Sequence, residues 1–282
     1  MTIKDTEQIL KDVTRNYKSR DNESIKDNLA LLKEKALNNN KNEEAKHIWC
    51  LETILSAQRY YTEAYSLFIE EKYYDGWCKL EQAEHSCAFL ERHFSDEDNL
   101  YQISFMKSHI PKLQSLFPYK VFISPEFIGR ARCSICNEII SPRKKCSHKL
   151  GDIYRGEMVG RKLEQLEFLG MALVRNPVQK YSVAFTGKDD PNSYLLVKYY
   201  IDCIQSPFDR WEYTETRKLY PHSFFSDVKH SDKCPCQSGE IYSECCLKNE
   251  EGVKMPHFQF QFAKVKESAP LANQLILDKQ DN

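Results

Sequence analysis

The chain has 282 residues, of which 41% are hydrophobic, and its formal net charge is −1. A chain of this length and composition can bury a core of its own, and it carries no general basic coat for nucleic acid. Its 9 Gly and 11 Pro exclude a fibrous or disordered class. There is no run of about 18 apolar residues and no N-terminal secretion pattern, so we expect a cytoplasmic protein without a membrane span.

Residues 1–117 are expected to form a helical bundle. Apolar residues recur there at intervals of three and four, which is the spacing of one face of a helix. The stretches with this pattern are residues 25–36, 54–68, 74–90 and 99–117. Pro111 should kink or end the last of these helices. Residues 55–93 resemble a tetratricopeptide-type hairpin, but no second copy follows at a period of about 34 residues, so a plain antiparallel bundle is the simpler interpretation.

The second half of the chain predicts a different architecture. β-Branched and aromatic residues concentrate from residue 118 onward, and this composition favours strands. Strands are expected at residues 119–125, 166–175, 181–185, 194–204 and 258–262. The predicted fold class is therefore α+β. Its expected parts are a helical domain at residues 1–117, a zinc-stabilised α+β region at 118–230, and a second zinc motif with a terminal strand at 231–282.

Four of the 11 cysteines gather near the C-terminus with the spacing Cys-x-Cys-x8-Cys-Cys. They are Cys234, Cys236, Cys245 and Cys246. In a reducing compartment clustered thiols serve metals rather than disulfides, and four thiolates complete the tetrahedral shell that Zn²⁺ prefers. Gly239 can supply the positive φ with which the loop turns back on the metal, and Tyr242 can cover one face. The alternative, four unrelated core cysteines, does not explain their close spacing.

This stretch resembles the SEC-C zinc motif, whose usual form is C-P-C-G-S-G-x2-Y-x2-C-C or C-H. The matching positions are Cys234, Pro235, Cys236, Ser238, Gly239, Tyr242, Cys245 and Cys246. The resemblance implies a zinc site and, in the export motor ATPase where the motif is best known, contact with an acidic chaperone. Where the family has Gly and several Lys, this chain has Gln237, Glu240, Ser243 and Glu244, which disfavours such docking. The chain also lacks the phosphate-binding loop of a motor ATPase.

A second cluster lies in the middle of the chain, with a Cys-x2-Cys pair followed by Cys-x-His. Its members are Cys133, Cys136, Cys146 and His148. A Cys-x2-Cys pair forms a knuckle whose backbone amides can point at the sulfurs, and three thiolates with one imidazole are an accepted zinc shell. The alternative is a knuckle-like turn with two free thiols. The run that continues to Pro177 resembles a pattern in poorly characterised bacterial and phage proteins, which implies no agreed activity.

Two zinc ions per chain are therefore the predicted cofactors. Both shells would be complete, which leaves no open position for an activated water. The sequence also lacks the zinc-protease, serine-hydrolase and deaminase motifs. Because the central cluster lies between the helices and the strands, its zinc is expected to support folding more than the C-terminal zinc does.

The leading interpretation is a non-catalytic protein that binds a protein partner, with the helical half as the binding face. The alternative is nucleic-acid binding at the central cluster, because residues 116–162 hold ten Lys/Arg and only four Asp/Glu. The candidate phosphate contacts are Arg143, Lys144, Lys145, Lys149, Arg155 and Arg161. A solvated basic rim would contain the same residues. An enzyme that uses zinc only for folding is a third interpretation and ranks below both.

Overall fold

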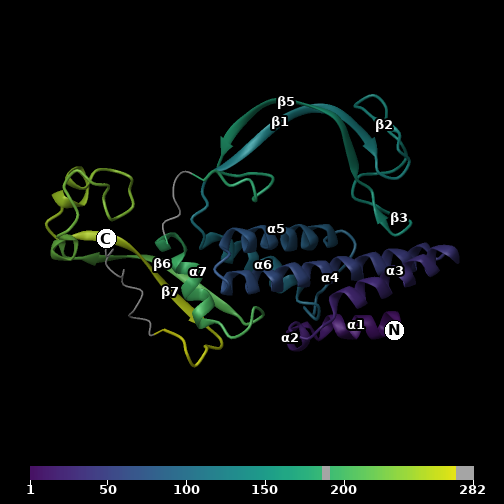
Figure 1. Ribbon diagram of the computed structural model, residues 1–282, viewed down its shortest axis with the longest axis horizontal. Coiled ribbons are helices and arrows are strands. Elements are labelled where there is room, and N and C mark those ends of the chain that lie inside the picture. Colours follow the sequence, from purple (N-terminus) through teal and green to yellow (C-terminus); the bar gives the residue numbers. More distant parts are fainter. Residues whose placement is uncertain (186–190, 271–282) are drawn as a thin grey trace. The chain divides into compact units, whose positions relative to one another are not determined.

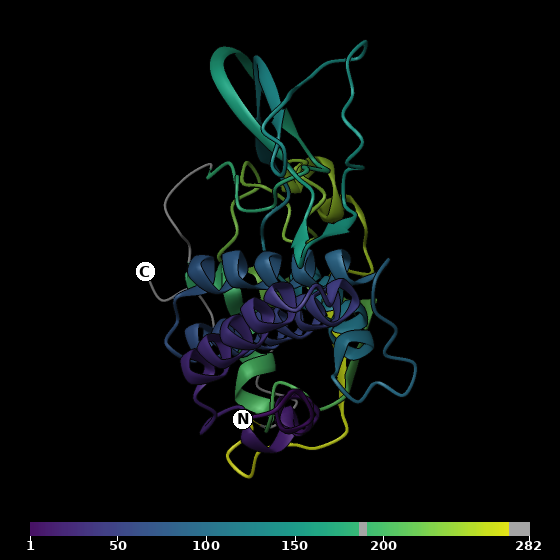
Figure 2. The same cartoon turned by 90° about the vertical axis from the view of Figure 1, so that its right-hand side faces the viewer.

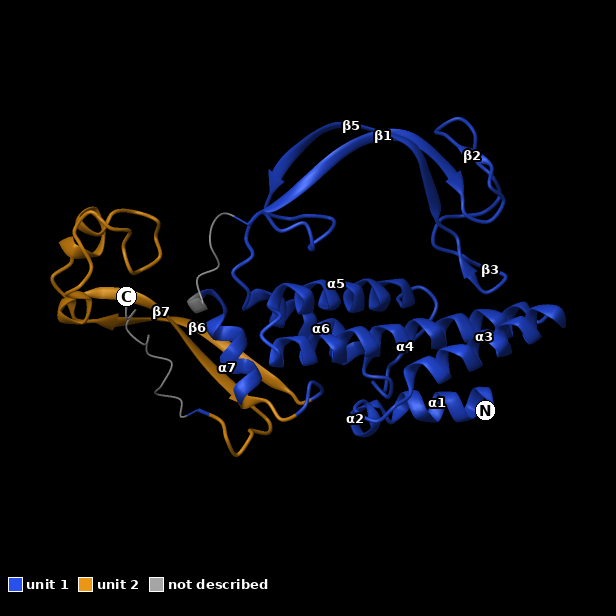
Figure 3. Ribbon diagram, viewed as in Figure 1, with its two compact units in different colours: residues 1–202, 206–208, 270–282 blue, residues 203–205, 209–269 orange. Residues whose placement is uncertain are grey.

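The computed structural model describes residues 1–185 and 191–270, and the chain divides into two compact units (Figure 3). Unit 1 comprises residues 1–202, 206–208 and 270–282, and unit 2 comprises residues 203–205 and 209–269. Within the described residues, none of the helices combines the length and the apolar character that crossing a bilayer requires.

Six helices form the first part of unit 1, and the predicted helical region is confirmed (Figure 1). They are α1 (Ile3–Lys11), α2 (Val13–Asn16), α3 (Asn22–Asn38), α4 (Asn42–Ile69), α5 (Tyr73–Leu90) and α6 (Ile103–Ser115). Thr2 and Asp5 cap α1 reciprocally, which satisfies two backbone amides at its start. The α4 and α5 helices pack as a hairpin, and Ile54 and Leu80 on them are fully buried. Pro111 does not end α6, which continues to Ser115.

Residues 122–174 of unit 1 are built on a long antiparallel ribbon. Its elements are β1 (Phe122–Cys133), β2 (Ile139–Ile140), β3 (Ile153–Tyr154), β4 (Glu157–Met158) and β5 (Arg161–Val174). β1 pairs with β5 along most of its length and with β2 near its end, whereas β3 and β4 form a separate small hairpin. At two bulges β5 places one extra residue against β1. Figures 1 and 2 show the β1–β5 ribbon arching away from the helices.

The predicted strands at residues 119–125 and 166–175 correspond to β1 and β5, but the strand predicted at 194–204 is wrong. That segment forms a 3-10 turn, η1 (Pro191–Tyr194), followed by helix α7 (Leu195–Cys203). Tyr194, Val197 and Ile201 are buried, and their spacing of three and four is that of one helical face. Periodicity therefore outweighed β-branched composition. The strand predicted at 181–185 is reduced to a single bridge between Val183 and Phe122.

Unit 2 is built on a second antiparallel ribbon. Its elements are β6 (Trp211–Tyr220), η2 (His222–Phe225), η3 (Tyr242–Glu244), η4 (Cys246–Lys248) and β7 (Val253–Phe262). β6 and β7 pair without a bulge from one end to the other. The predicted strand at 258–262 lies within β7, whereas its partner β6 was not predicted. A small core between the ribbon and the connecting loop includes Phe225, Tyr242, Val253 and Met255.

Candidate metal centres

The structure brings the eight candidate ligands together as two groups of four. Site 1 contains Cys133, Cys136, Cys146 and His148, and site 2 contains Cys234, Cys236, Cys245 and Cys246. Within each group the ligand atoms all lie within 4.8 Å of one another. A tetrahedral zinc with Zn–S bonds of ~2.3 Å holds its sulfurs about 3.8 Å apart. The Sγ of Cys245 lies 3.5 Å from that of Cys236 and 3.9 Å from that of Cys246, so site 2 has the dimensions of a zinc shell.

Site 1 begins where β1 ends, because Cys133 is the last residue of that strand. The chain then turns sharply. The N–H of Asn137 donates to Cys133 O at 3.0 Å, the N–H of Cys133 donates to Glu138 O at 2.9 Å, and Asn137 has φ 58°. Asn tolerates this left-handed conformation better than most residues. Backbone N–H groups of Cys136 and Ile135 lower the pKa of the Cys133 thiol, so amides are directed at sulfur as the knuckle requires.

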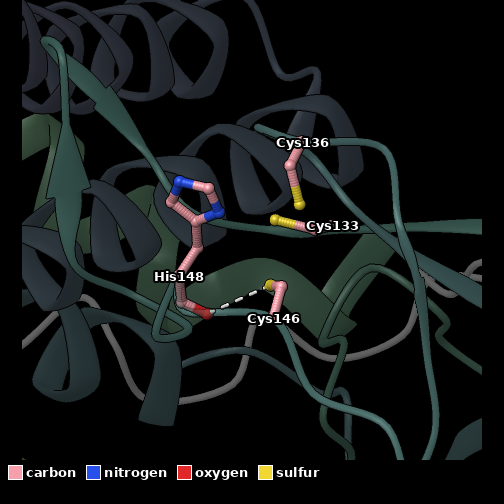
Figure 4. Close-up of side chains that lie close together, drawn as sticks. All are labelled: Cys133, Cys136, Cys146 and His148. Atoms are coloured by element: carbon pink, nitrogen blue, oxygen red, sulfur yellow. Dashed lines mark hydrogen bonds between the residues drawn. The ribbon is translucent and has the colours of Figure 1, made fainter.

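His148 offers a nitrogen to site 1. Figure 4 shows its ring turned toward the sulfurs of Cys133 and Cys136. Its Nδ1 is buried without a hydrogen-bond partner among the described residues, which is costly unless something else occupies the lone pair. A metal ion at the centre of the group would occupy it, so the residues fit zinc. The Sγ of Cys146 lies 3.7 Å from His148 O, a hydrogen bond that a thiol makes and a metal-bound thiolate would give up.

The loop that carries site 1 is tied to the helices of unit 1 through its acidic residues. Lys33 on α3 lies 3.0 Å from Glu157, and Arg92 just after α5 lies 2.9 Å from Asp152. The acidic side chains of these pairs are 64% exposed for Glu157 and 43% exposed for Asp152, so each ion pair contributes little to stability. Their main consequence concerns charge, because two acids close to site 1 are already paired with cations from the helices.

All six candidate phosphate contacts are exposed near site 1. They are Arg143, Lys144, Lys145, Lys149, Arg155 and Arg161. Lys144 lies 3.6 Å from Glu138. In the part of the chain that the structure describes, the other five form no ion pair. Since Glu157 and Asp152 are engaged elsewhere, the surface around site 1 keeps an excess of positive charge.

Site 2 uses a similar turn, and two of its sulfurs belong to the core of unit 2. Cys234 and Cys236 are 3% and 5% exposed. The N–H of Cys234 donates to Glu240 O at 2.7 Å, and the N–H of Gln237 donates to Cys234 O at 3.0 Å. Gly239 has φ 86°, which confirms the predicted positive φ at this position.

Cys236 and Cys246 of site 2 differ in acidity. Burial opposes ionisation of Cys236, but hydrogen bonds from Ser238 and Cys234 outweigh it and lower the pKa of Cys236 to about 6. Burial raises the pKa of Cys246 to about 12. Because a thiolate is the form that binds metal, Cys236 is closer to its metal-binding form near neutral pH than Cys246 is.

Two residues outside the motif, His222 and Asn249, hold site 2 in place through Tyr242. Tyr242 is 2% exposed, and its hydroxyl lies 2.7 Å from Nδ1 of His222. Nε2 of His222 lies 2.7 Å from Asn249 O. A carbonyl can only accept, so Nε2 carries the proton and Nδ1 accepts from the Tyr242 hydroxyl. His222 lies in the segment that follows β6, and its ring joins that segment to the loop of site 2. No spacing in the sequence indicates this role.

The two sites share one architectural arrangement. Each lies in the connection between two long antiparallel strands: site 1 between β1 and β5, and site 2 between β6 and β7. In both cases the connection would otherwise be a long loop with little core of its own. A metal ion there closes the loop on itself and fixes one end of the ribbon.

These features define an α+β protein with two Cys/His groups consistent with zinc sites. The chain matches no family model, and comparison with the curated proteins and with the solved structures finds no match.

Proposed function

We propose that this chain is a non-catalytic, zinc-binding interaction protein. The observation that supports the proposal is that each metal group offers four protein ligands within 4.8 Å of one another. Four ligands fill a tetrahedral zinc shell, whereas a catalytic zinc keeps one position open for water or substrate. The two zinc ions would serve to hold the ribbons and their connecting loops in shape, so that these surfaces can receive a protein partner.

Site 2 is proposed to be a SEC-C-type zinc motif. The support is the match of its fixed residues together with the geometry of the loop, in which Gly239 has the left-handed conformation and Tyr242 is buried against the site. The side chains of Gln237, Glu240 and Glu244 are exposed around it. Because Glu240 and Glu244 stand where basic residues are usual in the family, the partner at this site would not be an acidic chaperone.

The tagged full chain should retain a protein partner from native cells after nuclease treatment. The same partner should be lost when both zinc ions are stripped by a chelator, because the binding surfaces depend on the metal-held loops. The measurement is the set of proteins retained before and after each treatment. A partner that disappears with nuclease alone would contradict this proposal and favour the next one.

A second candidate function is nucleic-acid binding at site 1. The observation that favours it is a group of basic side chains around the metal position, including Arg143, Lys145 and Lys149, that form no ion pair with the described acidic residues. Neutralising phosphates with such residues releases counterions and drives association. Lys33 and Arg92 keep this surface basic, because they neutralise the nearby acids Glu157 and Asp152.

Replacing Arg143, Lys144 and Lys145 together by Ala should weaken duplex DNA binding while both zinc ions remain. The three residues are exposed and are not ligands, so the fold should not change. Wild-type affinity should fall with salt at a log–log slope of about −0.9 per phosphate neutralised, and the variant's slope should be shallower. Fluorescence anisotropy across a salt series measures both. No binding at low salt, or an unchanged slope in the variant, would exclude this surface as a nucleic-acid site.

A further inference from the structure

The β1–β5 ribbon has two faces of opposite character. Side chains alternate between the faces along each strand, and paired residues share one face. The apolar face, as we define it, consists of Leu166 and the cross-strand pairs Ile123/Leu173, Pro125/Met171, Phe127/Phe168 and Ala131/Leu163. Leu166 lies over Gly129, where a Cβ would come within 2.7 Å of its Cδ2. None of these side chains is charged, and the first charge on this side is Arg161, paired with Cys133 at the end of the ribbon.

The opposite face of the ribbon carries the charges. Its central members are Glu126, Ile128, Arg130, Arg132, Lys162, Glu164 and Glu167. Arg132 and Glu164 form an ion pair across the strands, with Nε and Oε2 2.7 Å apart. An antiparallel sheet with one apolar and one charged face normally packs its apolar face on a core and leaves the other to water.

The apolar face is nevertheless exposed. The exposed fractions of its large side chains are 50% for Phe127, 51% for Leu166, 53% for Phe168, 63% for Leu163, 69% for Met171 and 71% for Leu173. A soluble monomer rarely exposes a contiguous apolar patch larger than a few hundred Å². A face of this composition therefore requires a covering surface.

The area of the face matches what a specific dimer needs. A half-exposed side chain of this size exposes on the order of 100 Å² of apolar surface to solvent. Six of them present on the order of 600 Å² per copy, or about 1,200 Å² when two copies meet. Specific protein interfaces bury more than roughly 1,000 Å² in total. The face also lacks charges, so packing it against a copy of itself buries no unpaired ion.

We propose that two copies of the chain form a dimer through these apolar faces, on a two-fold axis beside Phe127 and Phe168. The two rings are in edge contact, with centroids 5.7 Å apart and planes at 63°. They form the middle pair of the face, with Pro125/Met171 on one side and the smaller Ala131/Leu163 pair and Leu166 on the other. A two-fold interface uses the same patch on both partners, and an apolar face extending on both sides of its centre is complementary to itself.

The test compares two adjacent positions of β1 that point to opposite faces. Phe127→Glu should weaken the dimer on the order of 100-fold, because it places two carboxylates near the axis of a desolvated interface. Ile128→Glu should leave the dimer intact, because Ile128 is equally exposed, at 57%, but lies on the charged face. Sedimentation velocity over a concentration series measures the dissociation constants of the full-length proteins. Zinc content and circular dichroism verify that both variants are folded.

A second measurement locates the contact. With p-benzoylphenylalanine in place of Phe168, light should cross-link one copy to the other, and the adduct should map to residues 122–133 or 161–174. A wild-type chain that stays monomeric at every concentration would overturn the proposal. Equal weakening by the two glutamates would overturn the assignment of the face. A monomer that binds phosphatidylcholine vesicles through Phe127 would also overturn it, in favour of a lipid surface. None of these outcomes bears on whether the protein binds zinc or another protein.

Discussion

Replacing Cys236 by Ser is expected to remove one of the two zinc ions and to unfold residues 209–269, while the helices of unit 1 stay folded. Cys236 is buried at the centre of a small core that includes Phe225, Val253 and Met255. Binding of a structural zinc contributes roughly 10–16 kcal/mol of apparent free energy, whereas a whole domain is stable by only about 5–15 kcal/mol. A core this small cannot replace that contribution. Native mass spectrometry counts the metal, and hydrogen exchange locates the unfolding.

The matched control is Cys203→Ala. Cys203 is 2% exposed and belongs to unit 2, but it is not one of the metal ligands. Its replacement should cost about 1 kcal/mol and leave two zinc ions bound. If the Cys236 variant kept two zinc ions, or lost one without faster exchange in residues 209–269, the metal would not be holding unit 2 together.

The two groups of candidate ligands could be predicted because each is local in sequence. Each group lies within one short segment, residues 133–148 or 234–246, and the spacing follows from the size of a single metal shell. The supports of site 2 are different. His222 and Asn249 lie outside the motif, and their contact with one another depends on how the connection folds. A histidine outside a motif gives no sign in the sequence that its ring will bridge two segments.

Secondary structure was predictable where periodicity and composition agreed. The strand β6 was missed although Trp211 and Tyr213 alternate with Glu212 and Thr214, because its charged second half hides the pattern. Helix α7 has the composition of a strand, but its buried residues follow the spacing of a helical face. For α7 the period of the buried side chains was the better indicator.

The apolar face of the β1–β5 ribbon could not be derived from the sequence alone. A regular strand of period two would place Leu166 and Phe168 on the opposite face from Leu163 and Met171. The two bulges each add one residue to β5 and so shift the alternation twice. Gln165, with φ 52°, lies in one of these bulges, and no sequence feature predicts a bulge there. Only the pairing register shows that the four side chains share a face.

Replacing Cys133 by Ser is expected to loosen site 1 locally and to destabilise the protein less than the Cys236 substitution does. The central cluster lies between the helices and the strands in the sequence, which predicts that site 1 contributes more to folding than site 2 does. We now predict the reverse order, for three reasons. Cys136 in site 1 is exposed, the helices have their own core, and the loop keeps its ties from Lys33 and Arg92. The thermal midpoint of unit 1 should fall by roughly 10 °C or less. Hydrogen exchange should quicken mainly in residues 133–160.

Cys50→Ala provides the comparison for this second site. Cys50 is a buried thiol on α4 that is not a candidate ligand, so its substitution perturbs the helical core and leaves both metal groups complete. Its exchange pattern should differ from that of the Cys133 variant, with changes in the helices rather than in the ribbon. If Cys133→Ser instead lowered the thermal midpoint as much as Cys236→Ser, site 1 would join the ribbon to the helices more strongly than these few ion pairs indicate. The position of the cluster in the sequence would then be the better guide to its contribution.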